Sequence, residues 1–186
     1  MSLRIIAGEL GGRRIETPVG RGTRPTREAV REAWFSALGD DIRGSGVLDL
    51  FAGSGALGIE ALSRGAARVE FVESNRAVCR VLRENVRLLG IESLTAIRCA
   101  DALSVVATLA RSRRREWDIV LADPPYSGEA AADLVRAFDR FAFAHILCVE
   151  HSPRTELPRT ADWRRAYGDT TLSFFVDPTE GDTGHE

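Results

Sequence analysis

The chain lacks the sequence features of membrane and secreted proteins. Among its 186 residues, no apolar run approaches the roughly 18 residues that span a bilayer, and the start, Met1 to Arg4, does not have the layout of a signal peptide. We therefore expect a soluble, cytoplasmic protein. The length predicts one domain, which would bury about two thirds of its unfolded surface in a single core.

Cysteine is scarce, and lysine is absent. Cys79, Cys99 and Cys148 are odd in number, widely spaced and set in apolar stretches. This pattern argues against a disulfide framework and against a metal site. We therefore expect buried, reduced thiols and no metal ion.

Charge is distributed unevenly, although the formal net charge is only -2. Residues 1–31 hold seven arginines against three glutamates, whereas residues 177–186 hold four acids and no base. Cations neutralise the phosphates of nucleic acids, so the first segment suits contact with RNA. A charged segment that is merely solvated is the alternative.

From Gly46 onward, apolar strands alternate with amphipathic helices, and no repeat or low-complexity tract interrupts them. The expected strands are 47–51, 68–73, 95–99, 117–122 and 145–150, with helices starting near 56, 75, 102 and 128. This alternation predicts a parallel sheet with crossover helices on both faces. The connection between 163–167 and 171–176 is too short for a crossover, so we expect an antiparallel hairpin at the sheet edge.

Two smaller elements precede this sheet. Residues 3–7 and 13–17 flank a Gly-containing turn and predict a β-hairpin, and Thr26 is expected to cap a helix that runs to about Leu38. The predicted organisation is an extension over 1–40, a main domain over 41–176, and a disordered acidic tail over 177–186.

A glycine-rich turn follows the first strand of the sheet. Gly53 and Gly55 lie where this strand should pass into a helix, and the missing Cβ lets backbone approach a ligand closely. Gly58 would allow the helix to pack tightly on the sheet. The Gly-x-Gly-x-x-Gly spacing is a weak signal shared by dinucleotide binders. Asp49 suits a cationic ligand better than a pyrophosphate, with a buried structural aspartate as the alternative.

Further carboxylates follow the next two strands. Glu73 ends the second strand, where a carboxylate can accept both hydroxyls of a ribose, and Asp101 follows the third and can accept from an adenine amino group. Either residue alone could be a helix cap or a solvated turn acid. Together with Asp49, they surround the crevice where open α/β sheets bind ligands, so we predict a cofactor site.

A rigid acidic tip, Asp123-Pro124-Pro125-Tyr126, follows the fourth strand. The prolines fix φ and remove donors, which leaves backbone carbonyls and the Asp123 carboxylate as acceptors beside an aromatic ring. This arrangement suits a planar group that bears an exocyclic NH2. The alternative is a helix-capping turn with a packed tyrosine.

These motifs, in this order, resemble those of the class I S-adenosylmethionine-dependent amino-methyltransferases. Further segments are similar to the bacterial 16S rRNA guanine-966 N2-methyltransferases: Arg24-Pro25-Thr26, Asp49 to Gly58, Val149-Glu150, Tyr167-Gly168 and Leu172 to Phe175. The resemblance runs from the hairpin to Val176. One departure is Arg27-Glu28, where the family usually has Thr-Asp.

The resemblance implies an α/β fold, with a Rossmann-like, seven-stranded, mostly parallel sheet, an antiparallel C-terminal hairpin and a small N-terminal β-hairpin. It implies an enzyme that methylates the N2 amino group of a guanine in 16S rRNA, with S-adenosyl-L-methionine as cofactor. The substrate would be the small ribosomal subunit or an assembly intermediate, and the enzyme a monomer.

The resemblance also assigns residues to roles. Asp123 and the Pro124 carbonyl would pull on the amino hydrogens, and Tyr126 would stack on the extruded base. The catalytic set is Asp123, Pro124, Pro125 and Tyr126. The cofactor set is Arg24, Thr26, Asp49, Phe51, Ala52, Gly53, Ser54, Gly55, Glu73, Ser74, Asp101, Ala102 and Asp123. The RNA set is Arg4, Arg13, Arg14, Arg21, Arg27 and Arg31.

Two alternatives stay open. The first is an N6-adenine methyltransferase of DNA or RNA, because the acidic tip recognises an NH2 group rather than one base. The second is a non-catalytic RNA-binding protein on the same fold. The intact Asp-Pro-Pro-Tyr motif favours an enzyme, and the absence of an added target-recognition domain argues against a sequence-reading DNA enzyme.

Overall fold

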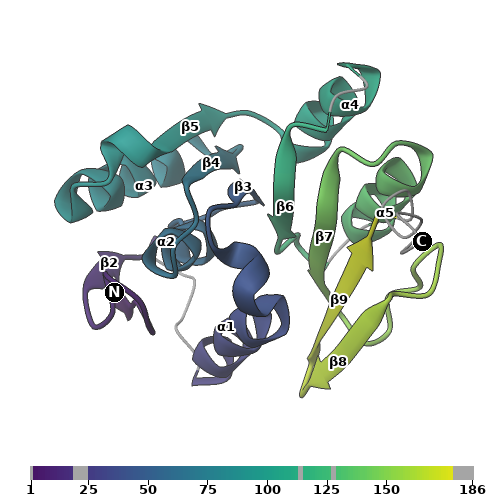
Figure 1. Cartoon of the computed structure of the whole chain (residues 1–186), viewed down its shortest axis with the longest axis horizontal. Coiled ribbons are helices and arrows are strands. Elements are labelled where there is room, and N and C mark those ends of the chain that lie inside the picture. Colours follow the sequence, from purple (N-terminus) through teal and green to yellow (C-terminus); the bar gives the residue numbers. More distant parts are fainter. Residues whose placement is uncertain (1, 19–24, 113–114, 127–128, 178–186) are drawn as a thin grey trace, which may run out of the picture.

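The computed structural model describes residues 2–18, 25–112, 115–126 and 129–177, excluding the side chains of residues 25–27. A two-stranded antiparallel sheet is formed by β1 (Ser2–Arg4) and β2 (Arg14–Glu16). The predicted N-terminal hairpin is therefore present, with strands shorter than expected. The other sheet has seven strands and forms the centre of the molecule (Figure 1).

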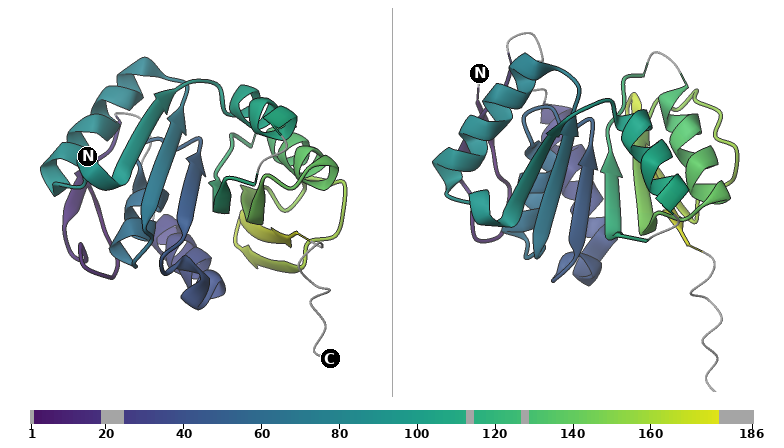
Figure 2. Two further views of the ribbon diagram at one scale, coloured as in Figure 1. Left: turned by 45° about the horizontal axis from the view of Figure 1, so that its top comes forward. Right: turned by 90° about the horizontal axis from the view of Figure 1, so that it is seen from above.

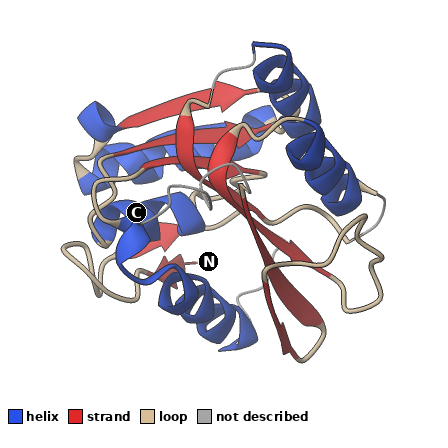
Figure 3. Cartoon of the chain, turned by 45° about the vertical axis from the view of Figure 1, so that its right-hand side comes forward, coloured by secondary structure: helices blue, strands red, loops and turns tan. Residues whose placement is uncertain are grey.

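The seven-stranded sheet has the order β5-β4-β3-β6-β7-β9-β8. Its strands are β3 (Gly46–Leu50), β4 (Arg68–Glu73), β5 (Thr95–Cys99), β6 (Trp117–Ala122), β7 (Ala144–His151), β8 (Trp163–Tyr167) and β9 (Thr170–Val176). The first five are parallel to one another, and β9 runs antiparallel to both β7 and β8. The predicted seven-stranded sheet with an antiparallel hairpin is confirmed, and Figure 3 shows that hairpin reaching away from the other strands.

Helices cover both faces of this sheet (Figure 2). They are α1 (Pro25–Leu38), η1 (Gly39–Ile42), α2 (Ala56–Ser63), α3 (Arg76–Leu89), η2 (Glu92–Leu94), α4 (Ala102–Ser112) and α5 (Ala130–Arg140). Apolar residues of α1, α2 and α3 pack in one core, and those of α4 and α5 pack in another. Successive strand residues face opposite ways, so Val47 belongs to the first core and Leu48 to the second.

Helix α1 and strand β9 begin at other residues than the sequence predicts. Helix α1 begins at Pro25, one residue before the expected cap, so the prediction that Thr26 caps this helix is wrong. Proline is favoured in the first turn because it has no N–H to leave unpaired there. Strand β9 begins at Thr170, which leaves a two-residue turn after Tyr167. Gly168 has φ 59 in this turn, a value that glycine adopts without strain.

The N-terminal hairpin is fixed to the body of the molecule. Ile5 and Ile15 are buried in the core shared with α1, α2 and α3. The side chain of Asn85 on α3 accepts from the Glu16 N–H at 2.8 Å, and donates to the carbonyls of Glu16 and Ser54, both at 2.9 Å. One buried amide thus joins the hairpin to the glycine-rich turn.

Two other predictions need correction. Cys79 on α3 and Cys99 at the end of β5 form a disulfide, so the expectation of reduced thiols is wrong for this pair, although Cys148 is free and buried. The two residues meet because α3 packs beside β5, with their Cα atoms 6.4 Å apart. Asp177, predicted to begin a disordered tail, is 2 % exposed and pairs with Arg115; the rest of that tail lies outside the described residues.

No helix in the described ranges combines the length and the apolar character needed to cross a membrane.

Candidate active site

The candidate site lies where the direction of the chain across the sheet reverses. Strands β4 and β5 continue to one side of β3, whereas β6 and β7 continue to the other. Ligands of open α/β sheets bind at such a point, beyond the carboxyl ends of the strands. A cavity of about 100 Å³ is found here, lined by residues of β3, of the glycine-rich turn and of the ends of β6 and β7.

The turn after β3 brings backbone close to this cavity. Phe51 has φ 59, the one positive φ among described non-glycine residues, and Gly53 and Gly55 have φ 57 and φ 86. A Cβ on Gly55 would lie 2.5 Å from Leu82 Cδ1, so a side chain cannot be accommodated there. Strained backbone persists where its surroundings hold it, and it clusters at ligand sites. Gly55 therefore allows close packing against the core, whereas the backbone of Gly53 lines the cavity.

Asp49 lies beneath this turn and is 1 % exposed. Its Oδ2 accepts from the Gly58 N–H at 2.9 Å, which ties the helix after the turn to β3. Burial raises the pKa of Asp49 to about 8, the Gly58 N–H opposes that rise, and the carboxylates of Asp123 and Glu73 add to it. A cation bound among these carboxylates would relieve their repulsion, so the cavity favours a positively charged ligand.

Glu73 supports the glycine-rich turn from β4. It is 9 % exposed, and its carboxylate accepts from the Gly53 N–H at 3.0 Å and from the Asn75 N–H at 2.8 Å. The predicted contacts with ribose hydroxyls would use the other lone pairs of the same oxygens, since a carboxylate offers about four acceptor sites. Glu73 thus fixes the turn whether or not a ligand is bound.

Asp101 acts as a cap for α4. Its Oδ1 accepts from the Ser104 N–H at 2.8 Å and from the Ser104 hydroxyl at 2.9 Å. The sequence is consistent with two roles for Asp101, a helix cap and an acceptor for an adenine amino group. One carboxylate has enough acceptor sites for both. Of the two other predicted cofactor residues nearby, Ser74 is exposed, and Ala102 begins α4 and is buried in the core that α4 shares with α5.

The acidic tip follows β6 on the other side of the cavity. Asp123 lines the cavity together with Asp49. Tyr126 is 45 % exposed, and its hydroxyl donates to Glu150 Oε1 at 2.8 Å and lies 2.5 Å from Thr170 Oγ1. Burial and the nearby Glu150 and Asp123 carboxylates raise the pKa of Tyr126, so the phenol stays protonated. Pro124 is buried and Pro125 is exposed.

The sequence reasoning missed several residues that wall the cavity. They are Leu3, Thr17, Pro18, Arg31, Trp34, Ala56, Leu57 and Glu150. Most belong to the hairpin and to α1, which precede the sheet in the sequence. Only the folded structure shows that they lie against the cavity. Glu150 could have been found, because the sequence predicts a strand that ends at this residue, and that strand is the next one after the strand that precedes Asp123.

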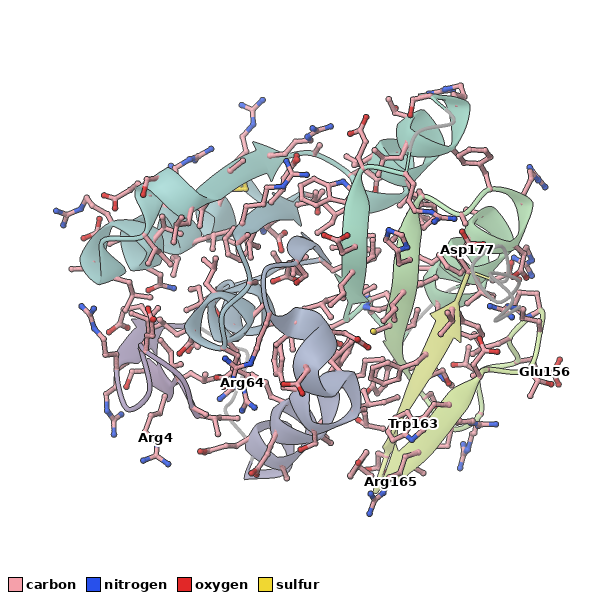
Figure 4. All side chains as sticks on the ribbon, viewed as in Figure 1. Arg4, Arg64, Glu156, Trp163, Arg165 and Asp177 are labelled. Carbon is pink, nitrogen blue, oxygen red and sulfur yellow. A yellow bond between two sulfur atoms is a disulfide. The ribbon has the colours of Figure 1, made fainter. Side chains whose placement is uncertain are left out.

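The predicted RNA-contacting arginines do not all lie in the same surroundings. Arg4 and Arg14 are exposed on the hairpin, and Figure 4 shows Arg4 pointing outward. Arg13 donates to the carbonyls of Leu88 and Leu89 at the end of α3. Arg21 and the side chain of Arg27 lie outside the described residues, as do Arg24 and the side chain of Thr26 from the predicted cofactor set.

The burial of Arg31 contradicts the prediction that this residue lies on an RNA-contacting surface. Its side chain is 5 % exposed, donates to the Arg4 carbonyl at 2.7 Å, and lies 3.8 Å from the Glu60 carboxylate. An amphipathic helix does not reveal which of its charged residues meets a buried partner from another helix, and this caused the error.

Comparison with known proteins identifies the family. The model of the family described as "Conserved hypothetical protein 95" matches residues 3–176. The chain belongs to this family. It is similar to the Bacillus subtilis protein named putative rRNA methyltransferase YlbH, with 32% identity over 85% of this chain and 87% of the relative. It is also similar to ribosomal RNA small subunit methyltransferase D of Escherichia coli, with 35% identity over 87% of this chain and 81% of the relative.

A solved structure confirms the fold. The structure described as putative methyltransferase yhhF from Escherichia coli has a TM-score of 0.79 and 30% identity, and the match covers 95% of this chain and 98% of that one. The class I methyltransferase fold is thus confirmed, and so is the family resemblance carried by the motifs. The two relatives above are named as methyltransferases.

Proposed function

We propose that this chain transfers a methyl group from S-adenosyl-L-methionine to the exocyclic N2 amino group of a guanine, of the position-966 type, in 16S rRNA. The observation that carries this proposal is the shared cavity of Asp49 and Asp123, which places a carboxylate for a cationic cofactor beside one for an amino group. The names of the two relatives above support an rRNA substrate.

The residues of the cavity fit this cofactor. Its ammonium and sulfonium groups are cationic, which suits the cluster of Asp49, Glu73 and Asp123. Backbone at Gly53 and Gly55 would lie along the methionine part, Glu73 would hold the ribose, and Asp101 the adenine. Arg24 or Thr26 would help to hold the carboxylate. When bound, the cofactor supplies a methyl group on a positively charged sulfur.

Asp123 and Pro124 would activate the nucleophile. The lone pair of a guanine N2 is delocalised into the ring, so the amino group attacks poorly while it stays planar. Hydrogen bonds from its two hydrogens to the Asp123 carboxylate and the Pro124 carbonyl would favour a tetrahedral nitrogen, whose lone pair points at the methyl group. Tyr126 would stack on the base, which must leave its neighbours to enter the cavity. The excess proton leaves the nitrogen easily after transfer, so Asp123 need not be a strong base.

Contact with the small subunit or its assembly intermediate would involve the extension before residue 40. Arg4 and Arg14 are exposed there, and each phosphate that they neutralise would add to the salt dependence of binding. The hairpin also walls the cavity through Leu3 and Thr17, so RNA docked on it would lie beside the chemistry.

Methyl transfer in vitro tests this proposal. Small subunits from a strain that lacks the enzyme are incubated with the chain and tritiated cofactor, and the modified nucleoside is identified by mass spectrometry. We expect N2-methylguanosine. Asp123→Ala should reduce transfer by about 100-fold or more, as for loss of a preorganised polar group, while cofactor affinity stays within a few-fold.

Asp133→Ala is the matched control, because Asp133 is an exposed α5 carboxylate paired with Arg136. It should transfer methyl at the wild-type rate. Detection of N6-methyladenosine instead would show that adenine, and not guanine, is the target base. Near-normal turnover by Asp123→Ala would reject the role given to Asp123.

A further inference from the structure

Glu150 lies beside Asp123 at the carboxyl edge of the sheet. Val149 is paired with Ala122 in the parallel register of β7 and β6, so the two acidic residues that follow occupy neighbouring positions on adjacent strands. Both line the same cavity. The site therefore has two carboxylates side by side where the methyl acceptor must enter.

The Glu150 carboxylate is oriented by groups from two other parts of the chain. The Tyr126 hydroxyl donates to its Oε1 at 2.8 Å, and the Thr170 hydroxyl lies 3.5 Å from the same oxygen. Tyr126 belongs to the acidic tip and Thr170 begins β9. A carboxylate can accept from several donors at once, so these contacts fix its direction and leave it able to accept from a bound base.

The bases differ in what they present to such a pair. The Watson–Crick edge of guanine carries two adjacent donors, the ring N1–H and the N2 amino group. Adenine carries its amino group beside N1, which has a lone pair and no hydrogen. A second carboxylate would meet a hydrogen on guanine, whereas on adenine it would meet a lone pair, which repels it.

We propose that Glu150 determines base specificity by accepting the N1–H of the target guanine, while Asp123 accepts from the N2 amino group. This inference rests on the proposed guanine methylation and names the residue that selects the base. A site built to accept a substrate N–H rejects an analogue without it strongly, because the acceptor is left without its donor.

The competing explanation gives Glu150 a structural role alone. It would then only hold Tyr126 in place for stacking, and its loss would slow methylation of every base equally. The two explanations differ in the ratio of rates for two bases, and this ratio is independent of general damage to the site.

Substitution of the target base measures that ratio. Small subunits are reconstituted with 16S rRNA that carries guanine or 2-aminopurine at the base methylated by the wild type. 2-Aminopurine keeps the amino group but has no hydrogen on N1. We expect the wild type to favour guanine by roughly 100-fold in kcat/KM. In Glu150→Gln the amide can donate to N1 of 2-aminopurine, so the preference should fall to within roughly 10-fold.

Two further variants complete the test. Glu150→Asp withdraws the carboxylate by one methylene and should also lower the preference for guanine over 2-aminopurine. This variant provides the test if Glu150→Gln does not fold. Asp133→Ala, the α5 control used above, does not touch the cavity and should keep the wild-type ratio. Folding of each variant is checked by calorimetric titration with the cofactor.

The outcomes separate this inference from the proposed function. Equal losses on both bases in Glu150→Gln and Glu150→Asp, with the 100-fold preference kept, would overturn the specificity role and leave guanine methylation standing. Failure of the wild type to form N2-methylguanosine would refute the proposed function itself. A lowered preference in both variants supports the assignment.

Discussion

Replacement of Glu60 by alanine should loosen the attachment of the hairpin and destabilise the protein. Glu60 is on α2, fully buried, and accepts from the backbone N–H groups of Ile6 at 2.8 Å and Ala7 at 3.1 Å. It also accepts from Arg64 Nε at 2.8 Å and lies 3.8 Å from Arg31 Nε. The alanine variant would leave a nearly buried guanidinium and two backbone donors without this acceptor.

The expected loss follows from these contacts. Removing one partner of a buried ion pair lowers the free energy of unfolding by about 3 to 5 kcal/mol. A typical domain has a free energy of unfolding of only about 5 to 15 kcal/mol, so this loss is a large part of it. For a chain of this length the melting temperature should fall by roughly 6 to 20 °C. Cofactor affinity should fall as well, because the hairpin residues Leu3, Thr17 and Pro18 wall the cavity.

Urea unfolding and amide hydrogen exchange measure this effect. The amides of Ile6 and Ala7 should exchange much faster in Glu60→Ala than in the wild type, whereas Glu60→Gln, which keeps one acceptor oxygen, should be intermediate. Glu84→Ala is the matched control, since Glu84 is exposed and pairs with Arg87 on the same helix; its unfolding midpoint should match the wild type. Equal midpoints for Glu60→Ala and Glu84→Ala would show that the hairpin is not held in this way.

Three other substitutions test the cavity and its support. Glu73→Ala should weaken cofactor binding by about 1 to 3 kcal/mol, because ribose acceptors and the anchor of Gly53 are lost; unchanged affinity by calorimetry would reject this placement. Gly58→Ala should cost about 1 to 3 kcal/mol in urea unfolding, since its Cβ would lie 2.4 Å from Phe71 Cε1; wild-type stability would contradict that contact. For Asp49, the pKa in the folded state is raised to about 8 from 3.8, so between these values the unfolded chain releases a proton that the folded one keeps, and stability falls as pH rises. Asp49→Asn should flatten this pH dependence in urea titrations, and an unchanged slope would refute it.

Much of the sheet, and of the edge where its parallel strands end, could be predicted from local sequence patterns and from one general rule about parallel sheets. Alternation of apolar strands and helices fixes parallel neighbours, and the ends of parallel strands meet at one edge, which places Asp49, Glu73 and Asp123 together. The family resemblance supplied the number of strands and the proposed roles of these residues. Neither source required knowledge of how helices pack.

The contacts that escaped prediction depend on packing between distant elements. Glu60 and Arg31 look like ordinary charged positions on amphipathic helices, and only the meeting of α1, α2 and the hairpin buries them. The disulfide between Cys79 and Cys99 depends in the same way on α3 lying beside β5. A sequence pattern records which face of a helix is apolar, but not which polar atom another element brings to it.

The Asn85 side chain bears on which positions of the chain are free to vary. Its hydrogen bonds run to main-chain atoms of Glu16 and Ser54, and such atoms are present for any residue at these positions, except that proline at position 16 would lack the N–H. Mutational drift in the hairpin or the turn can therefore leave the connection intact, whereas a change at position 85 breaks all three bonds at once. A hairpin grafted from a relative should dock on this chain provided that its backbone follows the same path, and the α3 asparagine is the residue to keep.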